Sequence, residues 1–181
     1  MNKNFKKFKI NCWLVKLVYV TIFQIFLISF VHANTQLVFF EPGEKVLMQG
    51  EKAEFDLIYD VDMGKGKSTG LGIRIHYNSN TISNLSLIET YGEGLAGQDY
   101  LPKDDIEDFD NDPNTDKYIC VAWVGITGQW PSIVSLPLRL GKIIAQLKTD
   151  INMEETQIKI SYSSIPIGYS FESKSISLFI K

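Results

Sequence analysis

The most distinctive chemistry in the sequence lies in an acidic stretch that ends at Asp116. Carboxylates recur at every second position at Asp108, Asp110 and Asp112, and Asp116 follows them. Side chains spaced in this way can converge on a hard cation when the chain wraps around it, and calcium gathers about six to eight oxygen ligands. We therefore predict these four aspartates as candidate ligands of a structural calcium ion.

The stretch does not match the calcium loop of a helix-loop-helix protein. Pro113 stands where that loop requires glycine, and Ile119 stands where it requires a bidentate glutamate. The alternative interpretation is a solvated acidic loop that keeps the protein soluble. Both interpretations remain open at the level of the sequence.

Aromatic residues supply a second set of candidate binding groups. Trp130 lies between Gly128 and Pro131, in a turn-like segment where a large ring is hard to bury. An exposed ring of this kind can stack on a sugar or anchor a protein interface. Tyr91 and Tyr100 are further candidates for ligand binding. The alternative is that Trp130 closes one end of a hydrophobic core.

The inventory for catalysis is poor. Beyond residue 33 the sequence has a single histidine, His76, and no Gly-x-Ser-x-Gly motif or phosphate-binding loop. Any Ser/His/Asp arrangement would have to use His76, which we expect on the polar face of a strand. A glycosidase would need carboxylates that face each other across a cleft, whereas the acids here cluster in one loop. We therefore expect no enzymatic activity, with a glycosidase-like enzyme as the remaining catalytic hypothesis.

The first 33 residues have the pattern of a secretory signal peptide. Five lysines, the last of them Lys16, precede an uncharged apolar run from Leu17 to Val31, and Val31-His32-Ala33 offers a processing site after Ala33. The alternative is an uncleaved membrane anchor over Cys12 to Val31, which approaches the length of a span. In both cases we expect the folded part to be secreted, periplasmic or at the cell surface.

Residues 34–181 are then expected to form one domain. They carry 13 basic and 21 acidic side chains, a net charge of −8, so a nucleic acid is not an expected partner. Cys120 is the single cysteine of this part, and no disulfide can hold the fold together. The fold must therefore depend on its hydrophobic core or on a metal.

Short runs of alternating apolar and polar residues predict β-strands with one buried face. The clearest are Ala53–Tyr59, Leu71–Tyr77 and Thr156–Tyr162. Weaker runs are 36–41, 45–48, 82–88, 117–125, 138–148 and 175–180. About nine strands without a convincing amphipathic helix predict an all-β protein, an antiparallel β-sandwich or jelly roll. The polar segment 91–116 interrupts this rhythm, and long loops of this kind are often functional.

Three segments resemble a known family. They are Gly70–Asn78 (GLGIRIHYN), Asp108–Trp123 (DFDNDPNTDKYICVAW) and Gly128–Pro131 (GQWP). Together they resemble the cohesin-like modules of bacterial exported proteins, which share a jelly-roll fold with cellulose-binding modules. The resemblance covers most of residues 36–181.

The resemblance implies a non-catalytic binding module that docks a protein module or a polysaccharide at the cell envelope. The alternative function is a carbohydrate-binding module that acts through exposed aromatic rings. The sequence carries no dockerin and no catalytic module, and fold carries over between relatives better than function does.

Overall fold

The computed structural model describes residues 34–62, 67–132 and 135–181. The predicted signal peptide, its cleavage site and the alternative membrane anchor all fall within residues 1–33, outside the described residues. In the part that is described, no helix is long and apolar enough to cross a membrane.

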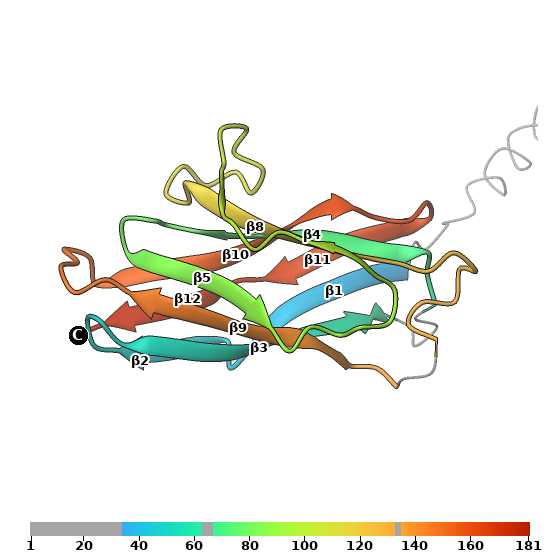
Figure 1. Cartoon of the computed structure of the whole chain (residues 1–181), viewed down its shortest axis with the longest axis horizontal. Helices are drawn as coiled ribbons and strands as arrows, with labels where there is room; N and C mark the ends of the chain where they lie inside the picture. Colours follow the sequence, from blue (N-terminus) through green and yellow to red (C-terminus); the bar gives the residue numbers. More distant parts are fainter. Residues whose placement is uncertain (1–33, 63–66, 133–134) are drawn as a thin grey trace, which may run out of the picture. The chain divides into compact units, whose positions relative to one another are not determined.

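Two β-sheets pack face to face over the described residues (Figure 1). The first has the order β11 (Tyr169–Lys174), β1 (Asn34–Glu41), β3 (Lys52–Val61), β9 (Leu138–Leu147) and β5 (Ile82–Ile88). The second has the order β2 (Glu44–Leu47), β12 (Ile176–Ile180), β10 (Glu155–Ser164), β4 (Gly70–Tyr77), β8 (Lys117–Val124) and β6 (Leu95–Gln98), and β7 (Lys103–Asp104) also pairs with β8. The predicted all-β sandwich is thus confirmed.

The sheets differ from the prediction in strand number and direction. Strands β6 and β7 lie inside the predicted loop, and β11 was not expected. Most of their residues are exposed, so they lack the apolar alternation that marks a half-buried strand. The pairs β1/β11 and β2/β12 are parallel, so the sheets are mixed rather than purely antiparallel.

The core lies between the two sheets and follows the alternation of the strands. On β4, Ile73 and Ile75 face inward and are fully buried. On β8, Val121 and Trp123 do the same, and the prediction that Trp123 is a core residue is confirmed. Burial of each large apolar side chain stabilises the fold by about 1.5–3 kcal/mol, so this alternation fixes which residues of each strand point outward.

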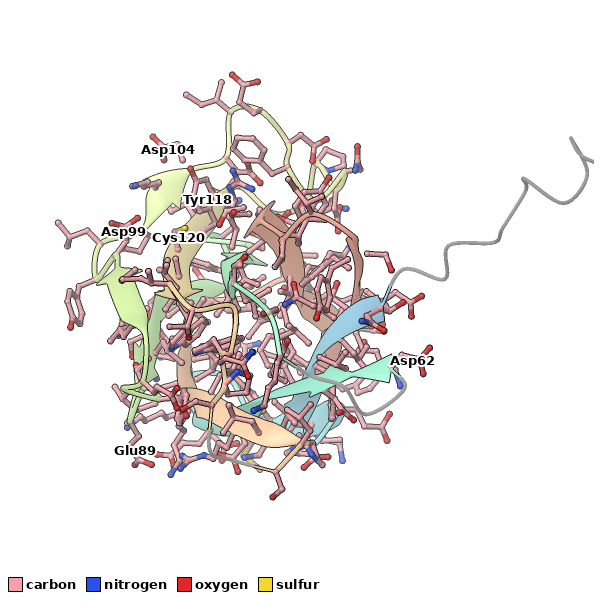
Figure 2. All side chains as sticks on the ribbon, turned by 90° about the vertical axis from the view of Figure 1, so that its right-hand side faces the viewer. Asp62, Glu89, Asp99, Asp104, Tyr118 and Cys120 are labelled. Atoms are coloured by element: carbon pink, nitrogen blue, oxygen red, sulfur yellow. The ribbon has the colours of Figure 1, made fainter. Side chains whose placement is uncertain are left out.

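The outward-pointing residues of the seven-stranded sheet do not all face solvent. His76 alternates with the core residues of β4, yet it is fully buried, because the segment 99–116 folds over this face. Strand β7 fastens that segment to the sheet by pairing Lys103 with Tyr118 of β8. Figure 2 shows Asp104, Tyr118 and Cys120 close to one another on this side of the molecule. We call residues 99–116 the covering loop.

Candidate functional site

A chain of polar side chains lies between the sheet and the covering loop. The Nδ1 atom of His76 is 2.8 Å from Oδ2 of Asp105, and its Nε2 atom is 2.7 Å from Oγ of Ser161 on β10. The side chains of His76 and Asp105 are both fully buried. Because both ring nitrogens are occupied, the imidazole is held in one orientation.

A second buried carboxylate completes this cluster. Oδ1 of Asp110 lies 3.9 Å from Nδ1 of His76, and the Asp110 side chain is 3% exposed. The hydroxyl of Thr115 donates to its carboxylate oxygens at 2.8 and 3.0 Å. Within the described residues, neither Asp105 nor Asp110 forms an ion pair with a lysine or an arginine.

Burial lowers the pKa of His76 below its ordinary value, although Asp110 and Asp105 both act to raise it. The ring is therefore neutral near pH 7. A neutral imidazole donates from one nitrogen and accepts at the other. Donation from Nδ1 to Asp105 leaves Nε2 to accept the hydroxyl proton of Ser161.

Ser161, His76 and Asp105 are hydrogen-bonded in the order of a nucleophilic triad. His76 is the histidine that the sequence predicts for any such arrangement. Hydrogen-bond order alone is not evidence of catalysis, because acyl transfer also requires donors aimed at a developing oxyanion. The ammonium group of Lys159, two residues from Ser161 on β10, could in principle be such a donor. Its Nζ atom is instead bonded to Asp112 at 2.6 Å. The cluster therefore carries no argument for hydrolysis.

The four predicted calcium ligands are not brought together. Asp108 accepts the backbone N–H of Asp112, Asp112 binds Lys159, and Asp116 accepts both the N–H and the hydroxyl of Ser79. Of the four, only Asp110 joins a group of three or more potential ligands in the described residues, and its companions are His76 and Asp105. The structure does not bring these four carboxylates together, and calcium binding by them stays a prediction.

The physical reason is local. Aspartate side chains readily accept hydrogen bonds from backbone N–H groups a few residues further on, and they tolerate left-handed conformations. Asp108 and Asn111 have φ values of 50° and 54°, and Asp112 caps the N–H of Asn114. These tight turns point successive carboxylates in different directions.

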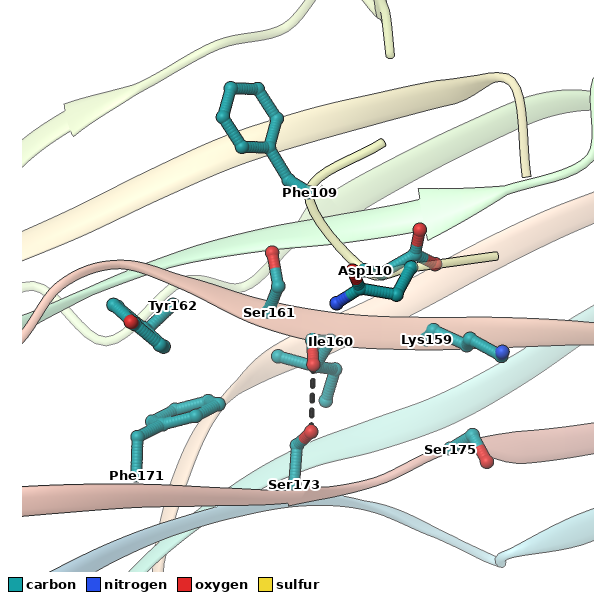
Figure 3. A pocket seen from close by; sticks show the side chains of 10 residues that line it. Phe109, Asp110, Lys159, Ile160, Ser161, Tyr162, Phe171, Ser173 and Ser175 are labelled. Atoms are coloured by element: carbon teal, nitrogen blue, oxygen red, sulfur yellow. Dashed lines mark hydrogen bonds between the residues drawn. The ribbon is translucent and has the colours of Figure 1, made fainter. Parts of the chain in front are cut away.

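A groove of about 350 Å³ runs beside the cluster (Figure 3). The covering loop forms one wall with Phe109, Asp110 and Asn111, and the other side carries Phe171, Ser173 and Ser175. Its floor is residues 159–162 of β10, where Ser161 points toward the loop. The guanidinium of Arg74 lies 3.8 Å from the centre of the Phe109 ring and supports that wall. The groove thus combines aromatic surface with hydrogen-bonding groups.

The predicted ligand-binding aromatics have different positions. Trp130 is 1% exposed and packs against Trp123 and Tyr59, so the prediction of an exposed platform at Trp130 is wrong. Tyr91 is half-buried, and its hydroxyl donates to Glu93. Tyr100 is 80% exposed and remains available to a partner.

The aromatics of the groove were not predicted. Tyr162 belongs to a predicted strand, and its ring is half exposed beside Phe171, with centroids 5.7 Å apart. Phe109 lies within the acidic stretch, in which only carboxylates were predicted to bind a ligand. The sequence does place Phe109 as an apolar residue between two aspartates. A large ring in such a polar segment is expected to pack against the protein, and this feature could have predicted its position.

Comparison with known proteins finds similarity among solved structures only. No protein-family model and no curated protein sequence matches the chain. Similar solved structures include the seventh ScaB type I cohesin of Pseudobacteroides cellulosolvens, with 8% identity over 81% of this chain and 92% of that chain, at a TM-score of 0.49. Another is the OlpA cohesin of Clostridium thermocellum in complex with Doc918, with 13% identity over 81% and 99%, at a TM-score of 0.48.

A third similar structure is the type III cohesin of the ScaE anchoring scaffoldin of Ruminococcus flavefaciens, with 12% identity over 82% of this chain and 88% of that chain, at a TM-score of 0.43. All three of these similar structures are cohesin modules, and each has a TM-score under 0.5 with this chain. At these identities the likeness concerns the fold alone, and no binding residue is carried over from it.

Proposed function

We propose that residues 34–181 form a non-catalytic binding module that docks a protein partner on the covering loop. The observation that carries the proposal is the exposure of three large apolar side chains on this loop. Tyr100, Leu101 and Ile106 are 80%, 79% and 89% exposed. Exposed apolar groups gathered on one segment are typical of the anchors of protein interfaces.

The chemistry of the loop indicates the kind of partner. Leucine and isoleucine side chains offer no flat face for a sugar ring, so they favour a protein over a polysaccharide. Glu107 and Asp108 are exposed in the same loop, whereas Asp104 is paired with Lys117. The expected partner therefore has an apolar patch with basic residues at its rim, and we expect its association to weaken as salt is raised.

The test compares retention of proteins from envelope extracts on immobilised parent protein and on two variants. The first variant replaces Tyr100, Leu101 and Ile106 with serine. The control variant replaces Ile126 and Ile167, which are fully exposed in other turns, with serine. We expect a protein that the parent and the control retain and the first variant loses. The same retained proteins on all three would contradict the proposal.

The groove supports a second candidate function, carbohydrate binding. Its half-exposed Tyr162 ring lies beside serine, asparagine and lysine side chains that can bond to sugar hydroxyls. The Tyr162 and Phe171 planes are 58° apart, so they do not form the flat row that suits a crystalline polysaccharide. Retention on a polysaccharide panel that Tyr162→Ala abolishes and Tyr100→Ala preserves would establish this function in place of protein docking.

We further propose that the module is exported. Support comes from the signal-like segment 1–33, with its lysines, its uncharged apolar run and the small residues Val31 and Ala33 before the expected cleavage site. N-terminal sequencing of the protein recovered outside the cytoplasm should give Asn34 as the first residue. An intact Met1 in the membrane fraction would indicate the anchored alternative.

A further inference from the structure

We propose that His76, Asp105 and Asp110 form a site for a divalent transition metal such as zinc, which clamps the covering loop to the sheet. One ligand comes from β4 and two come from the loop. This inference does not depend on the proposed docking function.

The geometry of the three side chains fits one ion. One ligand atom from each lies within 4.8 Å of the other two. Nδ1 of His76 is 2.8 Å from Oδ2 of Asp105 and 3.9 Å from Oδ1 of Asp110. Zinc binds nitrogen and carboxylate oxygen at about 2.0–2.2 Å, which places neighbouring ligand atoms about 3–4 Å apart. Small shifts of the side chains are therefore enough to enclose the ion.

The electrostatics of the cluster also call for a cation. The side chains of Asp105 and Asp110 are fully buried or nearly so, and the ion pairs of the described residues include no lysine or arginine for either. Arg74 acts on His76 from the same face of β4, but it forms no ion pair with either carboxylate. Adjacent buried carboxylates without a direct ion-pair partner are unfavourable when both are ionised. A divalent ion neutralises both.

Ser161 is placed to orient His76 as a metal ligand through a hydrogen bond. A metal at Nδ1 requires that nitrogen to be unprotonated, so the ring proton resides on Nε2. Nε2 then donates to Oγ of Ser161, at the present distance of 2.7 Å. Histidine ligands almost always donate their second ring N–H to an oxygen acceptor such as a carboxylate, a carbonyl or water, which fixes the ring and strengthens the ligand. The hydroxyl oxygen of Ser161 is such an acceptor.

The ligand set distinguishes this ion from calcium. Calcium prefers oxygen ligands only, whereas an imidazole with carboxylates suits zinc, cobalt, manganese or iron. Three protein ligands leave at least one coordination position for water or for a group of a partner. Asp110 also lines the groove, so the site lies beside the proposed binding surfaces.

The test uses purified protein stripped of metal with a chelator and titrated with Zn²⁺, Co²⁺ or Ca²⁺. We expect Zn²⁺ to raise the Tm, Co²⁺ to give visible ligand-field bands, and Ca²⁺ to do neither. Asp110→Asn should remove the Co²⁺ bands and weaken Zn²⁺ binding by about tenfold or more, and Ser161→Ala should weaken it by about tenfold. The exposed neighbour provides the control, because Asp108→Asn should leave binding unchanged.

The stripped variant gives a second, independent readout. Asp110→Asn removes one of two adjacent buried charges, so the metal-free variant should have a higher Tm than the metal-free parent. This also shows that the variant folds. The proposal is overturned if neither Zn²⁺ nor Co²⁺ binds the parent, or if Asp110→Asn and Asp108→Asn bind Zn²⁺ equally well.

Discussion

The indole rings of Trp123 and Trp130 stack inside the sandwich, with their centroids 6.1 Å apart and their planes at 26°. Each Nε1 atom donates to a backbone carbonyl, from Trp123 to Tyr91 and from Trp130 to Glu93, at 2.8 and 2.9 Å. Buried indole N–H groups require such partners. The pair therefore fastens the segment 91–93 to the core, and its role is structural.

This relationship predicts the effect of Trp130→Ala. Removal of the buried ring leaves a cavity and frees the carbonyl of Glu93, so the free energy of unfolding should fall by about 3–5 kcal/mol. Denaturant unfolding measures the loss. Tyr100→Ala, which truncates an exposed ring, should change stability by less than about 0.5 kcal/mol. Equal stability of the two variants would contradict the buried position of Trp130.

The sequence predicts the central strands well, because their physics is local. On β10, apolar and polar residues alternate and the apolar face is buried. On β4 the same alternation places Ile73 and Ile75 in the core, although the covering loop buries His76 on the other face as well. Strands such as β7, a pair of exposed residues, exist because β8 offers them a partner. The parallel pairing of β1 with β11 joins residues more than 130 positions apart. Such a pairing has no local sequence motif, so it cannot be predicted from the sequence.

The site is only partly predictable from the sequence, because its residues come from segments far apart in the chain. The sequence identifies Asp110 as a metal ligand candidate, but Asp105 and Ser161 reach His76 through the fold of the covering loop and the offset of β10 against β4. Carboxylates at every second residue converge on one ion only when the backbone wraps around that ion in a regular loop. Asp108 and Asp112 instead accept hydrogen bonds from the backbone N–H groups of Asp112 and Asn114, so their side chains do not point toward a shared ion.

Gly70 is predicted to resist substitution. Its φ is +132°, and a Cβ atom there would lie 2.1 Å from the carbonyl oxygen of Trp123 on the paired strand. Gly70→Ala must therefore separate β4 from β8 or strain the backbone, and it should cost about 2 kcal/mol or more. Gly97→Ala is the control, because a Cβ there meets nothing within 4 Å. Thermal unfolding of the two variants should separate them clearly.

Alkaline titration should report on the buried tyrosines. Burial raises the pKa of Tyr59 and of Tyr77 to about 12, from an ordinary value of 10.0. Their neutral form is favoured in the folded state, so the stability they contribute is complete below pH 10 and is lost as the pH rises toward 12. The expected loss is about 2 kcal/mol for each.

Tyrosinate absorbance followed from pH 9 to 12.5 measures this directly. Tyr59 and Tyr77 should ionise late or together with unfolding, and Tyr77→Phe should remove one late-titrating group. A titration in which every tyrosine ionises near pH 10 while the protein stays folded would show that these phenols are accessible to solvent.

The ion pair between Lys159 and Asp112 should stabilise the wall of the groove more than an exposed pair of the same length does. Its atoms are 2.6 Å apart with side chains 27% and 15% exposed, whereas Lys103 and Asp99 are 2.7 Å apart with side chains 55% and 41% exposed. Water screens exposed pairs strongly, and partial burial reduces that screening.

A double-mutant cycle with Lys159→Met and Asp112→Asn isolates this interaction, and we expect a coupling free energy of about 1 kcal/mol. The matched cycle with Lys103→Met and Asp99→Asn should give a smaller value that falls further in high salt. Because Asp112 follows Asp110 in the covering loop, Lys159→Met should also loosen the groove and increase cleavage of residues 99–116 in limited proteolysis. Equal couplings in the two cycles would mean that partial burial does not strengthen the pair between Lys159 and Asp112.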